Sequence, residues 1–171
     1  MAKNDVEAKT ANLTSEYKRR ADLVPQLIGA VAGNAKHEKD TLEAVIKARA
    51  SATSITLDPS NATPEQLRAY QGAQGQLSQA LGRLMMVTEN YPTLQANEAF
   101  LDLQAQLEGT ENRIKIARQD LIDSIQNFNN LVTVFPDSLT NNWFYHYSKM
   151  PQWDVDEDEK KADETAPQVK F

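Results

Sequence analysis

Cysteine is absent from the 171-residue sequence, and histidine occurs only twice, as His37 and His146. Without cysteine the chain can form no disulfide, thiolate zinc site or catalytic thiol. Neither histidine has another ligand-type residue at metal-binding spacing, because His37 and its neighbour Glu38 point about 100° apart on a helix. We therefore expect no metal site.

Patterns that carry catalysis are missing as well. The sequence shows no paired-carboxylate motif, no serine–histidine motif and no glycine-rich phosphate loop preceded by a strand. These absences favour a protein that is not an enzyme and holds no cofactor. The alternative is an enzyme with an unrecognised pocket, which would require convergent side chains with shifted pKa values.

Long apolar runs and a basic surface are also lacking. No stretch approaches the ~20 apolar residues of a membrane-spanning helix, so we expect the chain as given to be soluble. The formal net charge is -6, whereas nucleic-acid binding needs a basic face that displaces counterions from phosphates. We expect no nucleic-acid partner.

What the chain does have is 40% apolar residues, spaced by three and four almost from its start. This spacing predicts an all-α protein with three long helices. The predicted helices cover about residues 4–55, 63–90 and 97–135. Pro25 favours a bend in the first helix, since it has no N–H to donate. A break at Gly33 and Asn34 would give four helices, because both residues suit a helix C-cap, but the uninterrupted apolar stripe favours one.

Two helix starts are well defined. Thr63, Pro64 and Gln66 form the pattern of an N-cap, a first-turn proline and a capping box. Asn97 provides the next cap. Because the connection before Asn97 is short, the helices on either side should be antiparallel, and a third helix over residues 97–135 would extend about 58 Å. We predict an elongated antiparallel bundle.

The bundle domain is predicted over residues 1–136. Residues 137–153 form a short aromatic segment, which either packs on the bundle or is exposed as an anchor for a membrane or partner. The candidate anchor residues are Trp143, Phe144, Tyr147 and Trp153. Residues 154–171, rich in Asp, Glu and Lys, are predicted to be an acidic flexible tail.

A second candidate site is a dense polar set within the long apolar pattern. Its members are Arg19, Arg20 and Asp22 on the first helix and Glu108, Glu111, Asn112 and Arg113 on the third. If these side chains meet between helices, they select one register among those that a heptad seam allows, and Arg113→Ala should cost on the order of 2 kcal/mol or more. Otherwise they form a binding surface for a peptide or protein midway along the rod.

Several runs of residues resemble the LemA family of bacterial proteins. The runs at 17–25, 89–92 and 96–100 carry part of the likeness, and residues 107–114, which read Leu-Glu-Gly-Thr-Glu-Asn-Arg-Ile, are its most specific part. The likeness extends over roughly residues 4–171. It implies an all-helical antiparallel bundle tethered by an N-terminal membrane helix, with no established enzymatic activity or cofactor. This chain lacks that helix.

We therefore expect a non-enzymatic, membrane-tethered scaffold or protein-interaction module of the bacterial cell envelope. By the resemblance, its partners are other proteins and the membrane, reached through a single-pass N-terminal helix that the chain lacks. A membrane-remodelling or lipid-surface protein is the alternative, and exposure of the aromatic segment would indicate it. The sequence leaves open the oligomeric state and the side of the membrane.

Overall fold

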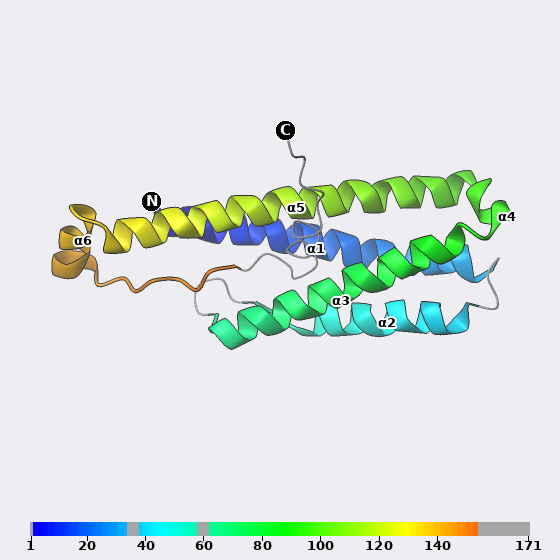
Figure 1. The fold of residues 1–171 in the computed structure, drawn as a ribbon, viewed down its shortest axis with the longest axis horizontal. Coiled ribbons are helices and arrows are strands. Elements are labelled where there is room, and N and C mark those ends of the chain that lie inside the picture. The colour runs from blue at the N-terminus through cyan, green and yellow to red at the C-terminus, as the bar shows by residue number, and fades with distance from the viewer. Residues whose placement is uncertain (1, 34–37, 58–61, 154–171) are drawn as a thin grey trace, which may run out of the picture.

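Four long helices run alternately up and down an elongated bundle (Figure 1). The computed structural model describes residues 2–33, 38–57 and 62–153, and every regular element in those ranges is helical. The long helices are α1 (Ala2–Ala32), α2 (Lys39–Ser54), α3 (Pro64–Thr88) and α5 (Glu98–Thr133). The most extensive helix pairs are α1 with α5 and α2 with α3. The predicted all-α, elongated antiparallel class is confirmed.

Shorter elements occupy the two ends of the rod. The turn between α3 and α5 contains α4 (Pro92–Gln95). After α5 come α6 (Asp137–Thr140) and the single π-helical turn η1 (Asn141–Tyr145), and α6 lies at the extreme end of the rod in Figure 1. The acidic tail predicted at 154–171 lies outside the described residues.

The prediction of one helix over about residues 4–55 is wrong. The chain reverses between Ala32 and Lys39, as in the alternative with four helices, and α2 returns along α1. A continuous helix of that length would extend about 78 Å, whereas the 36 residues of α5 extend about 54 Å. Reversal gives the apolar residues of α2 a neighbour to pack against, and Val45 joins Val31 in one core cluster.

The predicted helix starts are confirmed. The Thr63 hydroxyl accepts a hydrogen bond from the Gln66 backbone N–H at 3.2 Å, and the Gln66 side chain accepts one from the Thr63 N–H at 3.0 Å. The Asn97 side chain accepts a bond from the Phe100 N–H at 3.2 Å. These caps satisfy backbone donors that the first turn of a helix leaves unpaired.

Pro25 lies inside α1, where its missing N–H would have bonded the carbonyl of Ala21. A side chain from the next helix replaces this donor, because Arg49 of α2 donates its Nε–H to the Ala21 carbonyl at 2.8 Å. The proline therefore does not end the helix. It creates an acceptor that ties α2 to α1.

Apolar side chains form two separate core clusters along the rod. The first contains Val24, Leu27 and Val31 of α1 together with Leu77, Leu84, Phe100 and Leu107. The second contains Val6, Leu13 and Tyr17 of α1 together with Tyr70, Ile114, Phe128 and Trp153. On α1, α3 and α5 alike, the boundary between the clusters falls at a polar position. That boundary is the first candidate site.

Removal of the Arg49 donor tests the tie between α1 and α2. We expect Arg49→Met to lower the free energy of unfolding by about 1–2 kcal/mol, because the Ala21 carbonyl loses the donor that replaces a helical N–H. In a Pro25→Ala background, where residue 25 can donate again, the same substitution should cost less than about 0.5 kcal/mol. Urea denaturation of the four proteins measures this coupling. Lys47→Met, an exposed cation on the same helix, is the control, and an equal Arg49→Met cost in both backgrounds would contradict the interpretation.

Candidate functional site

Arg20 is the centre of a polar layer across the bundle, and its side chain is only 1% exposed. Its Nη1 donates to both carboxylate oxygens of Glu111 on α5, at 3.1 and 3.3 Å. Its Nη2 donates to the backbone carbonyl and to the side-chain oxygen of Gln74 on α3, at 2.9 and 2.7 Å. One guanidinium thus joins three helices through charge-assisted hydrogen bonds, which are the stronger kind.

Two further bonds complete this group, which we call the Arg20 layer (Arg20, Gln74, Ser78 and Glu111). The Gln74 amide donates to the Ala52 carbonyl on α2 at 3.1 Å, so the fourth long helix is included. The Ser78 hydroxyl donates to Glu111 at 3.3 Å. Arg20 also lies 5.1 Å from the centre of the Tyr17 ring, within cation–π range. The layer separates the two apolar clusters.

The structure brings together only part of the predicted polar set. Arg20 and Glu111 form an ion pair between α1 and α5. The remaining members, Arg19, Asp22, Glu108, Asn112 and Arg113, are exposed.

Arg113, a predicted member of the network, lies outside the Arg20 layer with a side chain 43% exposed. It donates to Glu16 of α1 at 3.0 Å and to the Thr110 hydroxyl at 2.9 Å. Because partly exposed ion pairs contribute little, we now expect the large cost predicted for Arg113→Ala to apply to substitution of Arg20 instead.

Gln74 and Ser78 were missed as partners of the polar set. Gln74 occupies a position of the apolar stripe of α3, between Tyr70 and Leu77, and it is buried. An amide at such a position needs a buried hydrogen-bonding partner. This was the signal that could have assigned α3 to the layer.

Substitution of Arg20 tests the layer directly. We expect Arg20→Met to lower the free energy of unfolding by about 3 kcal/mol, because Gln74 loses its donor while Glu111, about one-third exposed, stays partly hydrated. Arg113→Ala, the matched control on the surface ion pair, should cost no more than about 1 kcal/mol. Chemical denaturation of both variants measures the difference. Equal costs would show that the layer does not hold the register.

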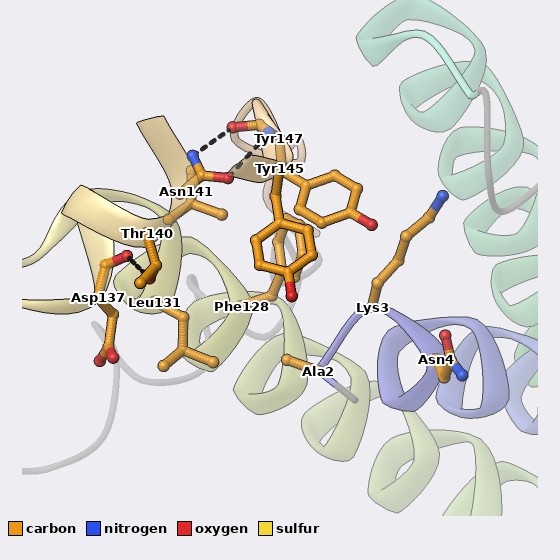
Figure 2. Close-up of a pocket in the computed structure, with 11 residues that line it drawn as sticks. Ala2, Lys3, Asn4, Phe128, Leu131, Asp137, Thr140, Asn141, Tyr145 and Tyr147 are labelled. Carbon is orange, nitrogen blue, oxygen red and sulfur yellow. Dashed lines mark hydrogen bonds between the residues drawn. The ribbon is translucent and has the colours of Figure 1, made fainter. Parts of the chain in front are cut away.

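The second candidate site is the aromatic tip, which we define as residues 134–147. Its most exposed aromatic side chains are Phe135, Trp143, Phe144 and Tyr145, each between 66 and 78% exposed. The Asn141 side chain shapes the turn, because it accepts a bond from the Tyr147 N–H at 2.9 Å and donates to the Tyr147 carbonyl at 3.0 Å (Figure 2). Residue His146 adopts a left-handed backbone conformation, with φ of 54°, where the chain turns back.

Beyond the tip, the chain returns along the bundle and is held by a second asparagine. Asn129 of α5 donates to the Met150 carbonyl at 3.0 Å and accepts from the Met150 N–H at 2.8 Å. Trp153 then packs edge-on against Tyr70, with ring centres 6.3 Å apart, and is 4% exposed.

The candidate anchor residues are therefore divided. Trp153 covers the core, Trp143 and Phe144 are exposed, and Tyr147 is 45% exposed. Tyr147 contacts Phe128, with ring centres 6.1 Å apart. The two alternatives for the aromatic segment, a cover and an exposed surface, apply to different residues of it.

Burial raises the pKa of Tyr70 to about 12, with a further increase from Tyr17 and an opposing effect of the Arg20 charge. A tyrosine in the unfolded chain has a pKa of about 10. The folded-state pKa is the higher one, so this contribution to stability is complete below pH 10 and is lost as the pH rises from 10 to 12. A difference of two pKa units between the folded and unfolded states corresponds to at most about 2–3 kcal/mol in the free energy of unfolding.

We expect Tyr70→Phe to reduce the loss of stability between pH 10 and 12. Urea denaturation at pH 9 and pH 11 measures the effect, with Tyr145→Phe in the exposed tip as the control. If the wild type and Tyr70→Phe lose stability equally over this interval, the assignment to Tyr70 is wrong.

The described residues, 2–33, 38–57 and 62–153, contain neither a metal-binding cluster nor a membrane-spanning helix. No group of three or more His, Cys, Asp or Glu side chains there could hold a metal ion. Nor is any helix in those ranges long and apolar enough to cross a bilayer.

Comparison with known proteins places the chain among bacterial relatives. It is 36% identical over 69 residues to magnetosome protein MamQ 2 of Paramagnetospirillum magneticum, covering 40% of this chain and 25% of the relative. MamQ of Magnetospirillum gryphiswaldense is 35% identical over the same length and shares. Protein LemA of Metamycoplasma hominis is 21% identical over 140 residues, which is 82% of this chain and 57% of that protein. The matched part of the chain thus spans only a quarter to about half of the length of these relatives.

The sequence profile of the LemA family matches residues 9–171, which is nearly the whole chain. This match includes residues 107–114, on which the resemblance mainly depended, and the position of Glu111 in the Arg20 layer. The chain belongs to the LemA family.

Proposed function

We propose that the protein is a non-enzymatic, membrane-tethered scaffold or protein-interaction module of the bacterial cell envelope. The observation that carries this proposal is the Arg20 layer, which links all four long helices at one level of the rod. A bundle fixed in this way holds surface groups at constant separations, as a scaffold requires. Membership of the LemA family supports the tether and the bacterial setting.

The geometry of α1 supports a tether that enters at the N-terminus. The helix runs without interruption from Ala2 past Arg20 to Ala32. A membrane helix joined to its start would therefore be connected to the Arg20 layer through continuous helix. The orientation of the tether would then set the orientation of the whole rod.

The proposed contact surface is the exposed part of the polar set. Arg19 and Asp22 flank Arg20 on α1, and Glu108 and Asn112 flank Glu111 on α5; all four are exposed. The Arg20 layer beneath them fixes the helices that carry them. Exposed charges of both signs provide specificity for a protein partner more than raw affinity.

Site-specific cross-linking in the native membrane tests this function. We expect a photoreactive amino acid at position 112 of the full-length, anchored protein to capture a defined protein. The same probe at Met86, an exposed side chain on α3, is the matched control. The charge reversals Asp22→Lys and Glu108→Lys should lower the yield at position 112 at least tenfold. They should leave the melting temperature within about 2 °C, because both side chains are exposed.

Two results would count against the scaffold proposal. One is the absence of any protein cross-link from position 112 when the protein is expressed at its native level. The other is capture of the same proteins from positions 112 and 86, since this would indicate contact without a defined surface.

A further inference from the structure

The aromatic tip exposes four large aromatic side chains. Phe135, Trp143, Phe144 and Tyr145 are each about two-thirds to three-quarters exposed. At 150–250 Å² for each side chain, these four present on the order of 600 Å² of aromatic surface. The sum is comparable in size to the largest apolar patch on an ordinary monomer, about 300–600 Å², and exposed apolar surface of that size marks interaction sites. Val134 and Leu139 of the same segment are also exposed and add to it.

The tip differs from the rest of the chain in charge. Charged residues make up 25% of the sequence, yet Asp137 is the one Asp, Glu, Lys or Arg within residues 134–147. Its remaining polar side chains are hydroxyls, amides and one imidazole. Aromatic side chains among uncharged polar groups suit the boundary between lipid headgroups and acyl chains, where Trp and Tyr are enriched.

The tip lies beside the start of α1. A pocket of about 370 Å³ is lined from one side by Ala2 and Lys3 and from the other by Tyr145 and Tyr147 (Figure 2). The Lys3 ammonium lies 6.0 Å from the centre of the Tyr147 ring. A tether that enters α1 would therefore hold the bilayer against this end of the rod. This orientation rests on the proposed tether, whereas the exposure of the tip does not.

We propose that the aromatic tip is a docking surface for a lipid bilayer, into which Trp143 and Phe144 insert. The tip occupies the extreme end of the rod in Figure 1, so it meets a partner end-on and with a small footprint. A stable protein interface buries about 800 Å² on each partner and seats its aromatic anchors in complementary pockets. A bilayer requires no matching pocket. It gains free energy from each aromatic side chain that leaves water.

The chain carries two tryptophans, which supply a matched pair of probes. Trp143 is 78% exposed in the tip, and Trp153 is 4% exposed in the core. In Trp153→Phe, only Trp143 reports, and phosphatidylcholine vesicles should shift its emission to the blue and protect it from iodide. In Trp143→Phe, only Trp153 reports, and the same vesicles should leave its emission unchanged. The assay adds vesicles to the 171-residue chain and does not depend on a tether, so failure here is distinguishable from failure of the scaffold proposal.

Co-sedimentation with the same vesicles measures the affinity. Trp143→Ser combined with Phe144→Ser should reduce the partition coefficient at least tenfold, because two aromatic side chains no longer enter the bilayer. Met86→Ser combined with Ile116→Ser removes exposed apolar side chains elsewhere and should change it less than twofold. Phosphatidylglycerol should not strengthen binding, because the net charge of the chain is -6 and the tip is nearly neutral.

Several outcomes would overturn the lipid assignment. One is an unshifted Trp143 emission at saturating vesicle concentration. Another is a blue shift without vesicles that grows with protein concentration, since it would identify a second copy of the chain as the occupant. A third is a protein cross-linked to position 143 in the native membrane while lipid is not. If Trp153→Phe does not fold, the emission of Trp143 is obtained by subtracting the spectrum of Trp143→Phe from that of the wild type. Vesicles should shift this difference spectrum to the blue.

Discussion

The buried charge of Arg20 is the constraint on which the rest of the fold depends. A guanidinium that is 1% exposed would cost several kcal/mol if it were unpaired, so the bundle must bring acceptors to it. Glu111 and Gln74 supply them from two other helices. Displacement of α3 by one heptad would put Leu67 or Leu81 in the place of Gln74, and the same displacement of α5 would put Gln104 or Arg118 in the place of the Glu111 carboxylate. The apolar seams allow sliding, whereas the polar layer permits one alignment.

The same register places the aromatic tip. Once Glu111 is opposite Arg20, the end of α5 falls beside the start of α1, and residues of both line one pocket. A shift of one turn between the helices would displace the tip by about 5.4 Å and separate Tyr147 from Lys3. The Arg20 layer, at the middle of the rod, therefore determines which groups meet at the end of the rod. The layer and the aromatic tip nevertheless share no residue.

Local chemistry was readable from the sequence, and long-range choices were not. Thr63 and Asn97 start helices through contacts within four residues, so their caps were predictable. The reversal after Ala32 was only an alternative, because Gly33 and Asn34 suit a helix C-cap while the apolar stripe keeps its phase through them and favours one helix. The aromatic segment has no periodicity that could separate Trp143 from Trp153. The different burial of the two tryptophans depends on Asn129 and Asn141. Their side chains form hydrogen bonds with backbone groups of Met150 and Tyr147, and no helical periodicity predicts these bonds.

The two candidate sites lie far enough apart to act independently. Glu111 precedes the end of α5 at Thr133 by twenty-two residues, which corresponds to about 33 Å along the helix. If the tip rests on a bilayer, the exposed polar residues around the Arg20 layer stand several Debye lengths above it, since that length is about 8 Å at physiological salt. Lipid charge then has little influence on those residues. A partner at mid-rod would be recognised by the protein surface alone, while the tip and tether set its height above the membrane.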